Sequence, residues 1–235
     1  MSEFTDKLSN VLLKINVKTQ EEQLFLFEKY FEEIVKANKT VNLTRILDED
    51  DAIVKHFADS LLIFSFLNFK KGDRVLDIGT GAGFPGVPIK IFFKDIEMTV
   101  LDSTEKKINI VRTITNNIGI DVKCITGRAE VLAHDLSYRE KFDVVVSRAV
   151  ARLNVLLELC LPYVKTGGLF LAYKSQGVDE IKEASSALKE LNARIEGVHN
   201  IAIEGIERSI IVVKKIGKNQ KKYPRIFSKI KSKPL

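Results

Sequence analysis

Two kinds of hydrophobic pattern divide the chain. Residues 20–37 place apolar side chains three or four positions apart with Glu and Lys between them, and residues 49–67 repeat this spacing, which predicts two helices. From residue 74 onward, short apolar runs alternate with helical stretches. The runs predict buried strands at 74–78, 98–101, 122–125, 142–146 and 169–173. The helices predicted around them are 87–93, 105–117, 129–134, 152–161 and 178–191.

Such alternation predicts a parallel sheet with helices on both faces. Two further apolar runs, 194–203 and 208–214, are separated by only Glu204-Gly-Ile-Glu207, a link so short that it permits only a hairpin. The predicted fold is therefore α/β and Rossmann-like, with a mostly parallel seven-stranded sheet that ends in an antiparallel hairpin. We expect an N-terminal helical extension without obvious chemistry, the sheet domain and a basic C-terminal tail, at residues 1–70, 71–216 and 217–235.

Composition indicates an ordinary globular protein, because 45% of its 235 residues are hydrophobic and 29% are charged. Cys124 and Cys160 lie in apolar surroundings without C-x-x-C spacing, so we expect both to pack in a reduced, cytoplasmic protein. The first residues do not resemble a signal peptide, and no apolar stretch is long enough to span a bilayer. The three histidines are isolated in the sequence, so no metal site is expected.

The net charge of +6 belongs to the C-terminal end of the chain. Residues 214–235 contain nine Lys or Arg and no Asp or Glu, and without them 28 basic residues face 31 acidic ones. Such a run is either a solvated, mobile end or an arm that binds a polyanion. Tyr223 and Phe227 lie among the cations, which suits RNA, and Lys221, Lys222 and Arg225 are the candidate phosphate contacts. The tail alone leaves both interpretations open.

The stretch VLDIGTGAGFPG at 75–86 can be read in two registers. Counted from Gly81 it is G-x-G-x-x-G, the turn of a dinucleotide fold; counted from Gly79 it is G-x-G-x-G preceded by Asp77. A carboxylate is unfavourable beside a pyrophosphate, whereas it suits the cationic sulfonium and ammonium groups of S-adenosylmethionine (SAM). Pro85 also removes an N–H where a helix would donate to phosphate. SAM is therefore favoured over NAD(P).

Asp102 follows the second predicted strand, where a carboxylate accepts hydrogen bonds from two ribose hydroxyls. Both cofactors contain that ribose, so Asp102 supports nucleoside binding without choosing between them. The terminal hairpin is typical of SAM-dependent methyltransferases, an analogy of fold class that favours SAM.

Eight stretches together carry a resemblance to one family. With them the chain resembles the bacterial 16S ribosomal RNA guanine-N7 methyltransferases (RsmG, formerly glucose-inhibited division protein B). The stretches are NLTR at 42–45, KHFADSL at 55–61, VLDIGTGAGFPGVPIKI at 75–91, VLDSTEKKI at 100–108, GRAE at 127–130, FDVVVSRAVARL at 142–153, LCLPYVKTGGLFLAYK at 159–174 and KKYPR at 221–225. The resemblance implies transfer of the SAM methyl group to N7 of a guanine in 16S rRNA. It implies a partner, the small ribosomal subunit or its RNA, and we expect a monomer.

The resemblance also implies roles for particular residues. Gly79 and Phe84 would line the methionine side of SAM, Asp102 and Ser103 its ribose, and Ala129 and Glu130 its adenine. Arg148 would lie beside the cofactor and the incoming base, and it is the candidate catalytic residue. The predicted cofactor site is completed by Asp77, Gly81, Gly83 and Thr104, and the predicted RNA-binding residues by Lys174.

Two absences agree with this chemistry. The place after the fourth strand holds Ser147-Arg-Ala-Val instead of the Asn/Asp-Pro-Pro-aromatic element of enzymes that methylate exocyclic amines. Neither cysteine is placed as the nucleophile that cytosine-C5 enzymes require. Guanine N7 needs neither device, because its lone pair is free at neutral pH. A SAM enzyme acting on a small molecule or protein, and a non-catalytic nucleotide- or RNA-binding protein, remain as alternatives.

Overall fold

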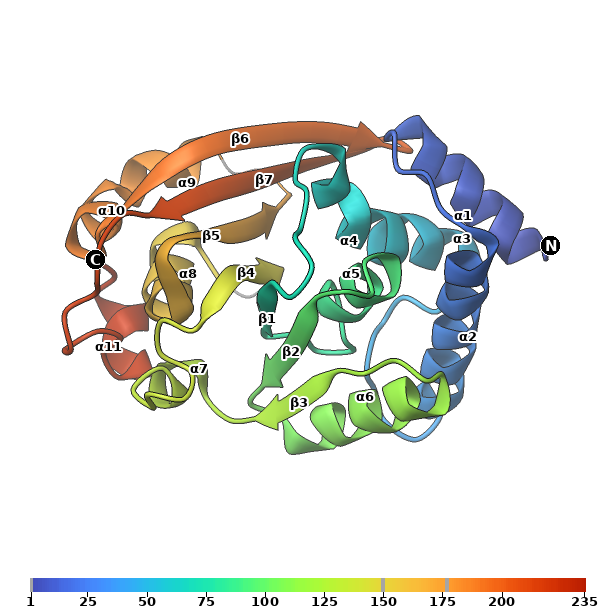
Figure 1. The fold of residues 1–235 in the computed structure, drawn as a ribbon, viewed down its shortest axis with the longest axis horizontal. Coiled ribbons are helices and arrows are strands. Elements are labelled where there is room, and N and C mark those ends of the chain that lie inside the picture. Colours follow the sequence, from blue (N-terminus) through green and yellow to red (C-terminus); the bar gives the residue numbers. More distant parts are fainter. Residues whose placement is uncertain (1, 149–150, 176–177) are drawn as a thin grey trace.

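One sheet organises the protein. The computed structural model describes residues 2–148, 151–175 and 178–235, and its sheet has the order β3-β2-β1-β4-β5-β7-β6 (Figure 1). The strands are β1 (Arg74–Ile78), β2 (Glu97–Asp102), β3 (Lys123–Thr126), β4 (Phe142–Arg148), β5 (Val164–Lys174), β6 (Ala193–Ile203) and β7 (Ile206–Lys215). Strands β1 to β5 are parallel, and β7 runs antiparallel to both of its neighbours. The predicted fold class is confirmed.

Helices cover both faces of this sheet, as the alternating pattern predicts. They are α5 (Gly86–Phe92), α6 (Glu105–Asn117), α7 (Ala129–Leu132), α8 (Leu153–Cys160), the 3-10 turn η3 (Leu161–Tyr163), α9 (Val178–Glu183), α10 (Ser185–Glu190) and α11 (Phe227–Ser232). Neighbouring residues of β1 enter different cores: Val75 packs with α5 and α6, whereas Leu76 packs with α8 and α10. A strand buried on both faces is continuously apolar, which is why these strands are visible in the sequence.

The N-terminal helices share the first of these two cores. They are α1 (Glu3–Lys14), α2 (Glu21–Asn38), α3 (Glu49–Ala52), the π-helical turn η1 (Ile53–Ala58), α4 (Asp59–Leu61) and the 3-10 turn η2 (Leu62–Ser65). Phe27 and Phe57 pack in the same cluster as Val87 of α5. The expected helix at 49–67 is therefore divided into four short pieces, and its π-helical turn carries His56. A boundary at residue 70 marks no break in the core.

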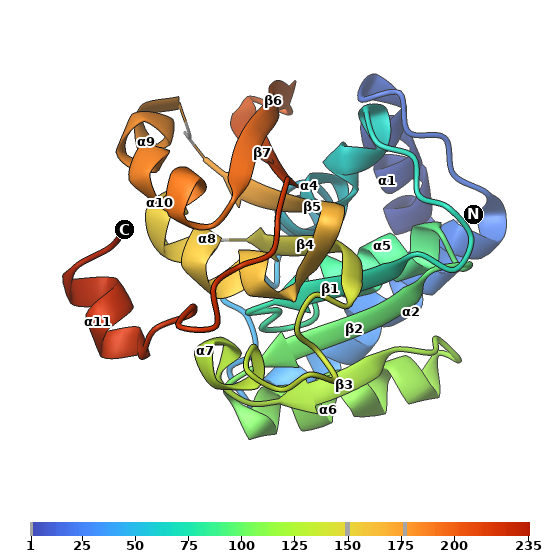
Figure 2. The ribbon, with the colours of Figure 1, turned by 60° about the vertical axis from the view of Figure 1, so that its left-hand side comes forward.

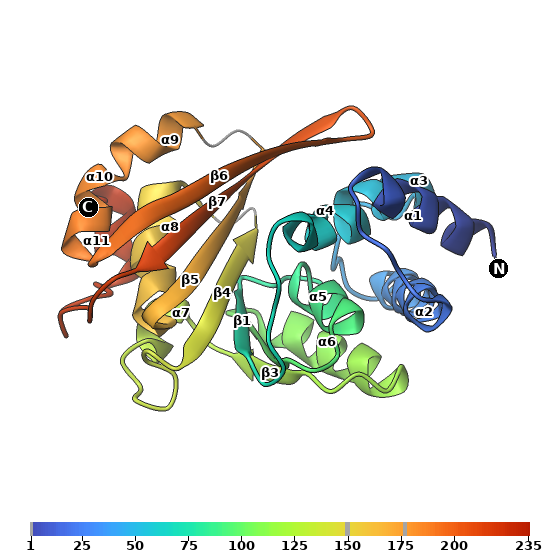
Figure 3. The same ribbon diagram turned by 45° about the horizontal axis from the view of Figure 1, so that its top comes forward.

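The hairpin of β6 and β7 forms one edge of the sheet, and its tip extends to these helices. Its turn consists of Glu204 and Gly205, both with positive φ, which is shorter than the four-residue link expected. At the tip, Glu204 pairs with Lys14 of α1 at 2.6 Å, and Figure 3 shows the hairpin extending over α4 towards α1. The hairpin therefore brings β7 beside the N-terminal helices.

Part of the C-terminal end of the chain is packed against the domain, which disfavours the first of the two interpretations left open, a solvated and mobile end. Tyr223 and Ile230 are buried in the second core, where α11 packs against α8 (Figure 2). Arg139 donates hydrogen bonds to the backbone carbonyls of Asn219, Gln220 and Tyr223. The hydrophobic pattern does not predict α11, because its few apolar residues lie among lysines.

Candidate functional site

The site lies at the carboxyl ends of the parallel strands, where the chain order reverses between β1 and β4. Ligands of open α/β sheets bind at such a switch point. Two pockets lined by described residues lie there. The first, called the Asp102 pocket, has a volume of about 250 Å³ and is lined by Ile78, Gly79, Leu101, Asp102, Ser103, Gly127, Arg128, Ala129, Glu130, Leu159 and Phe227. The Arg148 pocket, about 410 Å³, is lined by Ile46, Lys55, His56, Asp59, Arg148, Tyr173, Lys174, Ser175, Glu180 and Arg208.

Asp77 closes the glycine-rich turn from inside. Its Oδ2 accepts hydrogen bonds from the Thr80 hydroxyl at 2.6 Å and from the Gly86 N–H at 2.9 Å. The side chain is fully buried, and Oδ1 has no donor among the described residues. Burial raises the pKa of Asp77 to about 6, although the hydrogen bonds from Thr80 and Gly86 act to lower it. Asp77 is thus a buried carboxylate with one oxygen free to accept.

The three glycines of the motif have different roles. Gly79 lines the Asp102 pocket, and the Gly81 N–H donates to Asp102 Oδ2 at 3.0 Å. Gly83 faces α2 instead, because a Cβ there would lie 2.0 Å from the hydroxyl of Tyr30, and its φ is +90°. A side chain at Gly83 would displace α2 from the turn. The structure therefore gives Gly83 a packing role and places it outside the lining of either pocket.

Asp102 ends β2 with both carboxylate oxygens oriented by the backbone. Oδ1 accepts from the Thr104 N–H at 2.8 Å, while Oδ2 accepts from Gly81. Each carboxylate oxygen has further lone pairs, so the half-buried side chain can still accept from a ligand hydroxyl. Ser103 lines the same pocket, whereas the exposed Thr104 is the N-cap residue of α6 and contacts Asp102 through its backbone N–H.

Ala129 and Glu130 also line the Asp102 pocket, and their predicted contact with adenine stays a prediction. They begin α7, and the Ala129 carbonyl accepts a hydrogen bond from the Tyr163 hydroxyl at 2.6 Å. Glu130 accepts from Arg128 Nε at 2.6 Å, and only 9% of its side chain is exposed. The structure therefore brings Gly79, Asp102, Ser103, Ala129 and Glu130 to one pocket.

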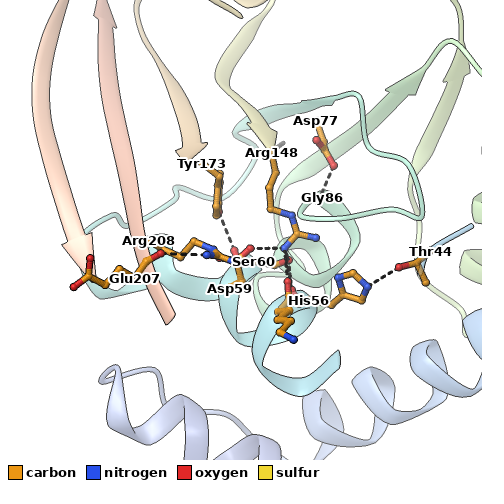
Figure 4. A network of polar contacts seen from close by, with 11 residues as sticks. Thr44, His56, Asp59, Ser60, Asp77, Gly86, Arg148, Tyr173, Glu207 and Arg208 are labelled. Atoms are coloured by element: carbon orange, nitrogen blue, oxygen red, sulfur yellow. Dashed lines mark hydrogen bonds and ion pairs between the residues drawn. The ribbon is translucent and has the colours of Figure 1, made fainter. Parts of the chain in front are cut away.

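Arg148 ends β4 and is held from the N-terminal helices (Figure 4). Its Nη1 donates to Asp59 Oδ2 at 2.6 Å and to the Lys55 carbonyl at 3.1 Å. A π-helical turn is wider than an α-helical one and is found at functional sites; here its carbonyls accept from a side chain. Asp59 Oδ1 also accepts from Arg208 Nε of β7 at 2.7 Å. A buried carboxylate thus lies between two guanidinium groups.

His56 and Phe84 stack in this region with ring centroids 4.4 Å apart. The His56 Nε2 lies 2.9 Å from the Thr44 hydroxyl, and burial together with Arg148 lowers the pKa of His56 to about 4. Phe84 is buried and its ring centroid lies 5.4 Å from the Arg148 guanidinium. Phe84 therefore packs beneath Arg148, and its predicted contact with methionine stays a prediction.

The first third of the chain, where the sequence shows no obvious chemistry, contributes side chains to the candidate site. Lys55, His56 and Asp59 of the N-terminal helices line the Arg148 pocket, and so does Arg208 of β7. The one sequence signal is Asp59, a carboxylate that falls between the apolar positions Phe57 and Leu61 of a predicted helix. Of the SRAV stretch after the fourth strand, residues 149 and 150 lie outside the described residues.

The predicted RNA-binding residues fall into two groups. The prediction that Arg225 is free to contact phosphate has to be corrected. Its backbone N–H, Nε and Nη2 all donate to the fully buried Glu158, so this guanidinium stabilises the fold. Lys174 is also engaged, with Ala151 and Glu180. Lys221 and Lys222 are exposed.

Cys124 and Cys160 are free thiols, the first half-buried on β3 and the second fully buried in α8. Among the described residues, no three His, Cys, Asp or Glu side chains are grouped to hold a metal ion. Within the same residues, no helix has the length and apolar character to cross a membrane.

Comparison with solved structures defines the class of the fold. The crystal structure of precorrin-6y C5,15-methyltransferase from Geobacter metallireducens GS-15 has a TM-score of 0.51 at 13% identity, covering 67% of this chain and 87% of that chain. The structure of MtNAS in complex with MTA and tNA has a TM-score of 0.56 at 17% identity, covering 83% and 72%. The fold is therefore that of the Rossmann-like methyltransferases.

Comparison of sequences identifies the family. The profile of the family described as "rRNA small subunit methyltransferase G" matches residues 23–211. A ribosomal RNA small subunit methyltransferase G from Clostridium novyi (strain NT) is 42% identical over 236 residues, 99% of this chain and 97% of that protein. Another from Clostridium kluyveri is 40% identical over 235 residues, 99% of each. The chain belongs to the rRNA small subunit methyltransferase G family, which confirms the resemblance and the methyltransferase class.

Proposed function

We propose that this protein transfers the methyl group of SAM to N7 of a guanine in 16S rRNA. The observation that carries the proposal is the pairing of two pockets at the ends of neighbouring strands, in a chain of this family. One pocket holds the acceptors suited to adenosine, and the other is built around Arg148. The reaction needs such an arrangement, because methyl donor and base must meet at one point.

Several residues fit SAM. Asp102 is oriented to accept from ribose hydroxyls, and Gly79 lets the backbone approach the ligand. The unpartnered Asp77 Oδ1 supplies a buried negative oxygen that suits a cationic ligand group. When bound, SAM supplies an electrophilic methyl group. NAD(P) fits less well, because the buried Asp77 would oppose a pyrophosphate.

The reaction requires little of the side chains beyond positioning the two reactants. The N7 lone pair attacks the methyl carbon as the bond to sulfur breaks, and no proton is transferred, so no general base is required. Holding the two reactants in line can lower the activation free energy by about 7–11 kcal/mol. The Arg148 bonds to described residues use Nη1, which leaves Nε and Nη2 for the base. Asp59 offsets the charges of Arg148 and Arg208 beside a base that becomes cationic.

The RNA contacts are proposed for exposed cations near the site and on the C-terminal segment. Lys221 and Lys222 are exposed on that segment, whereas Lys174 lines the Arg148 pocket with a largely buried side chain paired with Glu180, so it is the weaker candidate. Phosphate contacts of this kind position the RNA, whereas the pocket selects the base. The monomeric state, the cytoplasmic location and the domain boundaries stay predictions.

The test is transfer of labelled methyl from SAM to small ribosomal subunits that lack the modification. Borohydride–aniline scission then maps N7-methylguanine, and subunits already carrying the modification are the control. We expect label in 16S RNA with one new cleavage site. Label without cleavage would show that the acceptor atom is not guanine N7. No label on subunits or naked RNA would contradict the proposal and would call for titration with NAD(P).

A further inference from the structure

The C-terminal segment, residues 216–235, contributes a side chain to the Asp102 pocket. Phe227, the first residue of α11, lines that pocket together with Asp102 and Ala129, residues far from it in the sequence. The other lining residues come from the ends of β1 to β3 and from α7 and α8. A segment whose charge suggests an RNA-binding arm therefore forms part of the wall of a different site.

This segment is fixed on both sides of Phe227. Before it, Arg225 donates to the fully buried Glu158 of α8, with its Nη2 2.6 Å from Oε2, and the Pro224 carbonyl lies 2.9 Å from His134 Nε2. After it, Ile230 is fully buried in the second core. A buried carboxylate needs its partner, so the Glu158–Arg225 pair holds the segment in place. The position of Phe227 is thus determined by the fold.

The surroundings of the Phe227 ring suit a flat, aromatic ligand. The Arg128 guanidinium carbon lies 5.1 Å from the ring centroid, and Arg128 Nε pairs with Glu130 Oε1 at 2.6 Å. The pocket therefore combines an apolar aromatic ring with a charged pair on Arg128 and Glu130. A purine can lie against such a ring while its edge reaches polar groups.

We propose that Phe227 is a cofactor-binding residue whose ring forms the wall for the adenine of SAM, and that the C-terminal segment is part of the cofactor site. The identity of the ligand rests on the proposed function. The anchoring of the segment then serves cofactor binding, because any displacement of α11 removes one wall of the pocket. Lys221 and Lys222 of this segment stay exposed and can face RNA.

The experiment compares SAM with 5′-methylthioadenosine, which shares the adenosine half and lacks the amino-acid half. Dissociation constants are measured by isothermal titration calorimetry for the full chain and for Phe227→Ala. We expect both constants to rise by about tenfold and by the same factor, because aromatic stacking on a base contributes about 1–3 kcal/mol and the contact lies on the shared half. Phe227→Tyr should restore binding.

Ile226→Ala is the matched control, because Ile226 is the adjacent apolar residue and is 71% exposed. It should bind both ligands as the unaltered chain does. If Phe227→Ala proves unfolded by circular dichroism, Phe227→Leu replaces it, and a smaller loss common to both ligands is expected.

The outcomes separate the two proposals. An unaltered chain that binds neither ligand contradicts the proposed function. An unaltered chain that binds both, with unchanged constants in the folded Phe227 variants, overturns the inference while the proposed function stands. A loss confined to SAM also overturns it, because the contact would then lie on the amino-acid half.

Discussion

At the scale of single residues, two buried groups near the site have pKa values shifted in opposite directions. Burial raises the pKa of Asp77 to about 6, so the folded state binds the proton more tightly than the unfolded state and stability is lost as pH rises from about 4 to 6. Burial and Arg148 lower the pKa of His56 to about 4, so stability is lost as pH falls from about 6.5 to 4. Each shift corresponds to about 3 kcal/mol.

Because these two slopes oppose each other over the same range, His56→Gln should expose the effect of Asp77. In this variant we expect the free energy of unfolding to fall by about 3 kcal/mol as pH rises from 4 to 6.5, relative to the unaltered protein over the same range. Urea unfolding at several pH values measures it. A variant whose pH profile runs parallel to that of the unaltered protein would show that His56 is not buried in its neutral form.

A second prediction at this scale concerns the replacement of Arg148 by lysine. Lysine keeps the charge at 148, but its three N–H groups share one nitrogen, so it has no separate planar edge to present to a base while it bonds Asp59 and the Lys55 carbonyl. For Arg148→Lys we expect kcat for methyl transfer at saturating SAM to fall by about 100-fold, because small misplacement costs this much. Arg152→Lys is the control, since Arg152 forms an exposed pair with Glu183. Full activity in Arg148→Lys would show that the Arg148 guanidinium is not required for the reaction.

At the scale of elements, helix α2 is fitted to the glycine-rich turn through Tyr30. The Tyr30 hydroxyl donates to the Ala82 carbonyl at 2.6 Å and occupies the space that a side chain at Gly83 would need. The N-terminal extension therefore determines how tightly the turn is held, although its own sequence shows only amphipathic helices.

A double-mutant cycle tests this fit. We expect Gly83→Ala to destabilise the protein by about 1–3 kcal/mol, and part of that loss to disappear when Tyr30→Phe removes the overlapping hydroxyl. Gly81→Ala is the control, because Gly81 also has positive φ but a Cβ added there would meet no atom within 4 Å. Thermal and urea unfolding give the energies. Additive losses at 30 and 83 would contradict the contact.

At the scale of the whole molecule, the basic segment has to be tested by point substitutions. Truncation after residue 216 would remove Arg225 and leave the buried Glu158 unpaired, a change expected to cost about 3–5 kcal/mol. Loss of RNA binding in such a truncation would therefore reflect unfolding as much as lost contacts.

Lys221→Ala and Lys222→Ala avoid this difficulty, because both side chains are exposed. If each contacts a phosphate, each substitution should flatten the dependence of log affinity on log salt by about 0.7–0.9. Lys18→Ala is the control, because Lys18 is an exposed residue of the segment between α1 and α2. Figure 1 shows these two helices at the opposite end of the molecule from α11. A slope unchanged in both variants would place the RNA elsewhere.

Local patterns along the chain suffice to predict the sheet, its terminal hairpin and one half of the site. Parallel strands buried on both faces must be continuously apolar, and turns at their carboxyl ends carry glycine and aspartate for local reasons, so Gly79 and Asp102 could be found by spacing. Ala129, Glu130 and Arg148 needed the family resemblance, because nothing local distinguishes them from an ordinary helix start and a surface charge.

Which charges meet became visible only in the folded chain. Asp59 bonds Arg148 and Arg208, which lie 89 and 149 positions away, and helical periodicity cannot foresee such partners. The same holds for Arg225, which is basic like its neighbours but pairs with a carboxylate buried 67 positions earlier, and for Phe227, which that pair places at a pocket. Local patterns report burial along one element, whereas charge pairing depends on which elements pack together.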